Sequence, residues 1–191
     1  MQVSVVDVGG HAIANAVVVA TPINADNLPP ATAATAVMDQ TNKQFVPEVL
    51  VVRKGTLVAF PNSDSIAHQV YSFSPAKRFE LPLYRGRAHP PVLFDQPGIV
   101  VLGCNIHDRM AGYIYVTASP YFGKTDAMGR AQFTQLPAGN YKVTIWSPYF
   151  TEMPPEQSLG VSASDSADLR FALTRNLRPQ QPPIDPRVRD Y

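Results

Sequence analysis

One short segment, Cys104-Asn-Ile-His107-Asp-Arg-Met110, carries three side chains that bind transition metals. Thiolate, imidazole and thioether together suit copper, because both Cu(I) and Cu(II) accept these donors. Two histidines and one cysteine in a trigonal set, with a long axial methionine, form a blue copper site. The segment therefore predicts most of a copper site, with one histidine to be found elsewhere in the chain.

The chain has four histidines, so three candidates remain for the missing ligand. His11 lies beside Gly9-Gly10 and His89 precedes Pro90-Pro91, so both are expected in exposed turns. His68 follows a polar loop that comes after two predicted strands, and this loop can carry it over the sheet end where Cys104 lies. The predicted metal ligands are therefore His68, Cys104, His107 and Met110.

Two alternatives stay open for these residues. Zinc could use the same cysteine and histidines, although a thioether is a poor partner for it and structural zinc is usually held by four Cys or His ligands. A lone cysteine is also often a buried, unreactive thiol. Met110 and the upstream His68 favour a single copper ion over both alternatives.

The elements that must position these side chains are predicted to be strands. Short alternating or β-branched runs bounded by Gly, Pro, Asn and Asp recur along the 191 residues, and helical periodicity is hard to find. Nineteen prolines and a charged fraction of 16% also suit strands joined by turns. The sequence predicts an all-β fold with strands over residues 3–8, 16–21, 49–53, 56–61, 69–73, 92–94, 99–104, 112–117, 131–133, 141–146 and 168–173.

Residues 36–116 resemble the plastocyanin- and amicyanin-like cupredoxins. The Cys-x-x-His-x-x-Met spacing carries the resemblance, supported by Phe45-Val-Pro47, Phe60-Pro-Asn62 and Phe94-x-x-Pro97-Gly98. It implies a Greek-key β-sandwich over residues 36–118, with His68, Cys104 and His107 as equatorial ligands and Met110 as the axial one. The chain departs from the family pattern at Gln69, Asn105 and Ile106, which leaves the reduction potential open.

The segments on either side of this domain carry a pattern of their own. Residues 3–20 are expected to form a strand, a glycine turn and another strand, and Leu136-Pro-Ala-Gly139-Asn-Tyr141 marks a later turn. They resemble two halves of a carboxypeptidase regulatory-like, transthyretin-type β-sandwich that begins with a hairpin. We expect residues 1–22 and 119–174 to form that domain around the inserted cupredoxin, with a linker over 23–35 and a flexible Pro/Arg-rich tail over 175–191. The alternative is two sequential domains.

The function expected from this resemblance is that of an electron carrier rather than an enzyme. His107 would pass electrons to a redox partner protein docked on its face, with Ile106, Met110 and Ala111 as a surrounding apolar patch. Basic side chains would steer an acidic partner, namely Lys77, Arg78, Arg85 and Arg87. Copper storage or delivery, and an adhesion or scaffold module, are the other candidate functions.

Composition and charge exclude other classes of protein. The formal net charge is +1 and no basic block stands out, so nucleic acid is not an expected partner. The sequence contains no apolar run long enough for a membrane helix. The family resemblance implies an exported, periplasmic protein whose signal precedes this numbering, similar to bacterial methylamine utilisation-type proteins.

Overall fold

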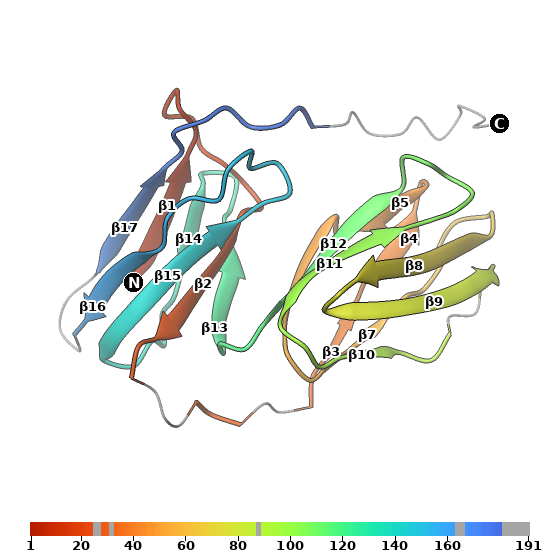
Figure 1. Cartoon of the computed structure of the whole chain (residues 1–191), viewed down its shortest axis with the longest axis horizontal. Coiled ribbons are helices and arrows are strands. Elements are labelled where there is room, and N and C mark those ends of the chain that lie inside the picture. Colours follow the sequence, from red (N-terminus) through yellow and green to blue (C-terminus); the bar gives the residue numbers. More distant parts are fainter. Residues whose placement is uncertain (25–27, 31–32, 87–88, 163–166, 181–191) are drawn as a thin grey trace. The chain divides into compact units, whose positions relative to one another are not determined.

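The computed structural model describes residues 1–24, 28–30, 33–86, 89–162 and 167–180, and these residues contain seventeen strands and no helix. The prediction of an all-β fold is therefore confirmed. None of the described residues forms a helix that could span a membrane. Figure 1 shows the strands in chain order.

Contacts between residues divide the chain into two compact units. Residues Met1–Pro29 and Ser119–Gln180 form one, named here the flank unit, and Pro30–Ala118 form the other, named the central unit. Each unit has its own cluster of buried hydrophobic side chains. The two units are described separately because each closes its own core.

The flank unit contains two sheets. A three-stranded sheet has the order β14-β1-β17 and a four-stranded sheet the order β13-β2-β15-β16. Inward-facing side chains of both sheets, among them Val5, Val18 and Ile145, share one core. The strands span Gln2–Val6 (β1), Val17–Pro22 (β2), Tyr121–Lys124 (β13), Arg130–Gln132 (β14), Gly139–Trp146 (β15), Gln157–Val161 (β16) and Asp168–Ala172 (β17).

The expectation that the chain begins with a hairpin is wrong. β1 pairs with β14 and β17, whereas β2 pairs with β13 and β15. The turn between them contains Gly10 at φ 82° and passes the chain from one sheet to the other. β1 alternates between buried and half-buried residues and β2 opens with four buried residues, but neither pattern determines the partner strand.

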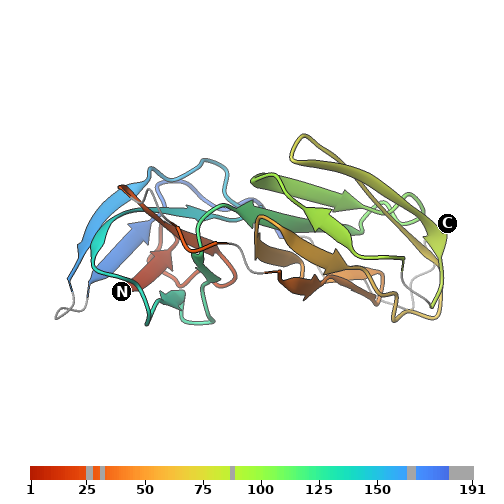
Figure 2. The same ribbon diagram turned by 90° about the horizontal axis from the view of Figure 1, so that it is seen from below.

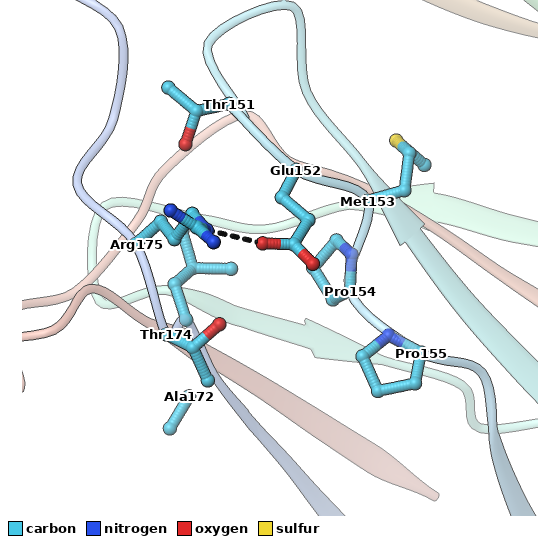
Figure 3. A pocket seen from close by; sticks show the side chains of 9 residues that line it. Thr151, Glu152, Met153, Pro154, Pro155, Ala172, Thr174 and Arg175 are labelled. Carbon is cyan, nitrogen blue, oxygen red and sulfur yellow. Dashed lines mark hydrogen bonds and ion pairs between the residues drawn. The ribbon is translucent and has the colours of Figure 1, made fainter.

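Residues directly after β17 are docked on the flank unit, in contrast to the flexible tail expected from Arg175 onward. Arg175 forms an ion pair with Glu152 at 2.6 Å beside a small pocket (Figure 3). The backbone N–H of Arg178 donates to the carbonyl of Tyr149 at 2.8 Å. Because the ion pair is exposed it contributes at most about 1 kcal/mol, so the backbone bond and the packing of Leu177 hold this segment. Residues 181–191 lie outside the described residues.

The central unit consists of two facing sheets and a hairpin. The larger sheet has the order β6-β12-β11-β8-β9, and the smaller one the order β10-β7-β3. Figure 2 shows the two sheets of this unit as two layers. Side chains from both sheets, including Val58, Phe94, Leu102 and Ile114, share one core, which makes this unit a β-sandwich. Its strands span Thr35–Val37 (β3), Asp39–Thr41 (β4), Gln44–Val46 (β5), Val49–Arg53 (β6), Thr56–Ala59 (β7), His68–Ser74 (β8), Lys77–Tyr84 (β9), Val92–Phe94 (β10), Gly98–Gly103 (β11) and Ala111–Thr117 (β12).

Strand pairing in the larger sheet brings three chain segments to one end of the sandwich. β11 is antiparallel to both of its neighbours, β12 and β8. The end of β11 at Gly103 therefore lies beside the start of β12 at Ala111, and it pairs with Tyr71 in the middle of β8, so that the next residues of β11 approach the start of β8. The residues that follow β11, precede β12 and open β8 must meet there.

A prediction about the flank unit concerns Gly129, which links its two chain segments. Gly129 lies at φ 70°, and a Cβ there would be 2.6 Å from the carbonyl oxygen of Val5. Gly129→Ala is expected to destabilise the flank unit by about 1–3 kcal/mol, measured by urea unfolding, because both backbone strain and a clash oppose it. Gly123→Ala in β13 is the control, since a Cβ there meets nothing within 4 Å. Equal stability of the two variants would contradict this pairing of the segments.

Candidate metal centre

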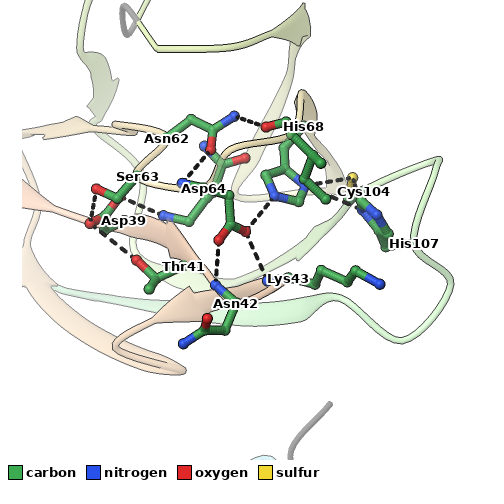
Figure 4. Close-up of polar contacts among 12 residues, drawn as sticks. Asp39, Thr41, Asn42, Lys43, Asn62, Ser63, Asp64, His68, Cys104 and His107 are labelled. Carbon is green, nitrogen blue, oxygen red and sulfur yellow. Dashed lines mark hydrogen bonds and ion pairs between the residues drawn. The ribbon is translucent and has the colours of Figure 1, made fainter. Parts of the chain in front are cut away.

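Three of the four predicted ligands meet at the end of the central sandwich (Figure 4). His68 opens β8, Cys104 follows β11, and His107 lies in the loop before β12. The Nδ1 atoms of the two histidines are 3.2 Å apart, and the Cys104 Sγ lies 3.9 Å from Nδ1 of His68 and 3.7 Å from Nδ1 of His107. All three side chains are buried, so the donor atoms face one another inside the protein.

The size of this donor triangle fits a metal ion at its centre. Bonds of about 2.0 Å to imidazole nitrogen and about 2.3 Å to thiolate sulfur place such donors about 3.4–3.8 Å apart. The three separations, 3.2, 3.7 and 3.9 Å, are close to this range. Thiolate and two imidazoles with a nearby thioether suit a single copper ion in both of its oxidation states.

The loop from Cys104 to Met110 is shaped by two successive backbone turns. The N–H of His107 donates to the carbonyl of Cys104 at 3.4 Å, and the N–H of Met110 donates to the carbonyl of His107 at 2.9 Å. Met110 is 2% exposed and belongs to the same core cluster as Cys104. Its burial contradicts the expected place of Met110 in a surface patch, because a side chain that faces the core cannot also contact a partner.

Hydrogen bonds to the Cys104 sulfur lower the pKa of its thiol. Burial raises the pKa of Cys104, but hydrogen bonds with His68 and with the backbone N–H groups of Gln69 and Ile106 outweigh it, so the pKa lies below its ordinary value. The chain departs from the cupredoxin pattern at both positions, yet the bonds come from the backbone and do not need a particular side chain. A stabilised thiolate favours metal binding, since the ligand must be deprotonated.

A β-bulge in β9 lies opposite the start of β8, beside Gln69. The register between β8 and β9 shifts between His68, opposite Tyr84, and Val70, opposite Leu81. Pro82 lies in the bulged stretch of β9, where its missing N–H costs no ladder bond. Bulges of this kind are frequent beside functional sites because they redirect side chains and backbone groups.

The structure adds one residue that the sequence analysis missed, Asp64. Its Oδ2 lies 2.7 Å from Nε2 of His68, so the carboxylate accepts a hydrogen bond from the imidazole. Burial lowers the pKa of His68, but hydrogen bonds with Cys104 and Asp64 outweigh it and raise the pKa above its ordinary value. An acidic residue four positions before the expected ligand, in a polar loop, was the available signal for this contact.

The surroundings of His107 differ in part from the expected docking face. His107 is only 7% exposed, whereas Ile106 is 49% exposed and Ala111 is also exposed. Of the expected basic residues, Arg78 and Arg85 are exposed, and Lys77 forms an ion pair with Asp95 at 3.6 Å. Arg87 lies outside the described residues.

The remaining two histidines are not part of the cluster. His11 is exposed, as expected, and pairs with Asp7. His89 is half-buried rather than exposed, because its ring packs edge-on against Tyr84 with centroids 4.8 Å apart. Among the described residues, His68, Cys104 and His107 form the one group of three or more Cys, His or acidic side chains suited to hold a metal.

Comparisons with known proteins find similarity at the level of structure only. No protein-family model matches the chain, and no curated protein matches it. Similar solved structures include a Cu-containing nitrite reductase from Thermus scotoductus. The two sequences are 25% identical, the match covers 52% of this chain and 25% of the reductase chain, and the TM-score is 0.41. A purple cupredoxin from Nitrosopumilus maritimus has 23% identity, 44% and 99% coverage of the two chains and a TM-score of 0.38. An amicyanin variant has 21% identity, 52% and 98% coverage and a TM-score of 0.39.

Proposed function

We propose that the protein is a blue copper electron carrier, with copper held by His68, Cys104, His107 and axial Met110. The observation that supports it most is the buried triangle of two imidazole nitrogens and one thiolate, with Met110 buried in the same core cluster. When bound, copper supplies one-electron chemistry by cycling between Cu(I) and Cu(II). The chain's own part is to hold these donors at fixed separations.

The rigidity of the donors suits electron transfer better than catalysis. Asp64 holds His68, backbone N–H groups hold Cys104, and two turns hold the loop to Met110. Four protein donors leave no open position for a substrate, whereas catalytic metal sites keep one. We therefore propose that the protein has no enzymatic activity.

The His107 face is the proposed exit for electrons. Ile106 in the loop and Ala111 directly after it are exposed and would contact a redox partner, and Arg78 and Arg85 would attract an acidic one. Contacts of this class are small and weak, under about 1,200 Å² of buried area. We also propose export to the periplasm, because a low-pKa thiolate and copper are poorly matched to a reducing cytosol.

We propose further that the flank unit is a carboxypeptidase regulatory-like β-sandwich into which the central unit is inserted. The pairing of β1 with β17, and of β2 with β15, supports this, since both pairs join the first chain segment to the last. The first flanking segment contributes only β1 and β2, too few strands to close a core of its own.

Voltammetry of the copper-loaded protein separates an electron carrier from a copper storage or delivery protein. A carrier is expected to give a reversible one-electron wave with little structural change between the two states. Tight copper binding without a reversible wave would instead indicate storage or delivery.

A second prediction concerns the axial ligand. Met110→Leu keeps the volume of the buried side chain and removes the thioether. It is expected to keep the intense visible absorption and to raise the reduction potential, because Cu(II) loses a donor that the axial position supplies. An unchanged potential would exclude Met110 from the copper site.

A further inference from the structure

The Asp64 side chain connects the metal centre to a hairpin turn more than twenty residues away. Its Oδ1 accepts a hydrogen bond from the backbone N–H of Asn42 at 2.6 Å, and its Oδ2 accepts one from the N–H of Lys43 at 2.8 Å. The same Oδ2 accepts the Nε2–H of His68 at 2.7 Å. One carboxylate therefore holds the turn and the ligand together (Figure 4).

The turn is built to present these two amides. Asn42 and Lys43 join β4 to β5 with φ values of 54° and 58°, the left-handed conformation that a two-residue type I′ turn requires at both positions. Neither residue is a glycine, so the turn is held in a conformation that costs energy for a lysine. The carboxylate of Asp64 offsets this cost by accepting both exposed N–H groups.

The loop that carries Asp64 is fixed from its other side as well. The Asn62 side chain donates to the carbonyls of Ile66 at 2.9 Å and Tyr84 at 3.0 Å, and it accepts the N–H of Asp64 at 3.0 Å. Ser63 donates its hydroxyl to Asp39 at 2.7 Å, and Asp39 belongs to β4 of the same hairpin. The Asp64 carboxylate thus has little freedom to leave the imidazole.

We propose that Asp64, held by the Asn42–Lys43 turn, is a positioning residue that fixes the ring orientation of His68. By doing so it lowers the reduction potential of the copper site, an inference that rests on the proposed function. With the proton on Nε2 held by Asp64, Nδ1 presents its lone pair toward Cys104 and His107. A carboxylate partner also makes the imidazole a more basic ligand, which favours Cu(II) over Cu(I).

Asp64→Asn tests the requirement for a carboxylate. An amide has a single acceptor oxygen, so it cannot accept both the turn N–H groups and the imidazole N–H. Loss of such outer partners typically costs 10–100-fold in metal affinity. We expect Cu(II) binding to weaken about tenfold relative to Cu(I), which raises the potential by about 59 mV.

Asp39→Asn is the matched control. It removes one carboxylate from the same cluster, but the asparagine oxygen can still accept the Ser63 hydroxyl, so the loop that carries Asp64 stays held. The Asp39 side chain contacts Gln40, Thr41 and Ser63 but not His68. We expect the ratio of Cu(II) to Cu(I) affinity to change less than twofold. Asp64→Glu keeps the charge but displaces it, so a potential close to that of Asp64→Asn would assign the effect to position. An unshifted potential in Asp64→Asn, or an equal shift in Asp39→Asn, would overturn the proposal.

A metal-free measurement separates this inference from the proposed function. In NMR of the copper-free protein, the Nε2 proton of His68 and the amides of Asn42 and Lys43 should exchange slowly with water. In Asp64→Asn they should exchange faster, whereas Asp39→Asn should retain slow exchange at His68. If the wild-type protein gives no copper-thiolate absorption, the proposed function and the potential shift both fail. Loss of His68 protection in Asp64→Asn would then still support the positioning role, and unchanged protection would refute it.

Discussion

Cys104→Ser is expected to abolish the intense visible absorption of the Cu(II)-loaded protein and to weaken Cu(II) binding by more than about 100-fold. The absorption comes from charge transfer between thiolate and copper, and Cys104 is the only cysteine in the chain. Even loss of a residue outside the coordination shell costs 10–100-fold, so loss of a direct anionic ligand must exceed it. Visible absorption during a Cu(II) titration measures both effects.

His89→Ala is the control for this substitution. His89 packs on Tyr84 and is outside the donor triangle, although it was one of three histidines considered for the missing ligand. It should leave the absorption and the copper affinity unchanged. Retained colour in Cys104→Ser, or lost colour in His89→Ala, would contradict the assigned ligands.

The largest effect on stability is expected from Phe94→Ala in the central unit. Phe94 is completely buried, and its ring meets that of Phe79 edge-on with centroids 6.0 Å apart. Removing such a ring costs about 3–5 kcal/mol through lost burial and the cavity that remains. Urea unfolding of the copper-free protein, followed by a probe in the central unit, measures this loss.

Phe73→Ala provides the comparison for Phe94→Ala. Phe73 lies on β8 of the same sandwich but is 74% exposed, and its main contact is the ring of Tyr71. Its removal should cost about 1 kcal/mol or less. Copper should raise the free energy of unfolding of Phe94→Ala by about 2.7 kcal/mol when the free copper concentration is 100 times the dissociation constant, because copper binds only the folded unit. Equal losses for the two variants would show that the core is not organised as described.

The Cys104 loop could be predicted from the sequence because its three donors, Cys104, His107 and Met110, follow one another at three-residue intervals between two predicted strands. His68 is the predicted fourth ligand because the polar loop before it follows two predicted strands, whereas His11 and His89 lie beside Gly and Pro residues. Asp64 could not be assigned a role in this way, because its role depends on the Asn42–Lys43 turn as well as on His68. The contact between Asp64 and the turn depends on the tertiary structure. The only local sign of a role for Asp64 is therefore its position four residues before His68.

Strand identity was also easier to predict than strand pairing. β6 and β10 were predicted with the observed bounds, and the strand β9 was missed because Pro82 interrupts it. In the structure that proline lies at a bulge, where no ladder bond is lost. β1 and β2 were expected to pair with each other, yet an apolar pattern specifies which residues are buried and not which strand lies next to them.

A titration of the metal-free, reduced protein with Cu(II), followed by visible absorption, determines whether the chain forms a copper-thiolate site. We expect intense thiolate-to-copper absorption that saturates at one copper per chain and is absent from Cys104→Ser. A colourless protein, or one whose absorption persists without Cys104, would contradict this expectation.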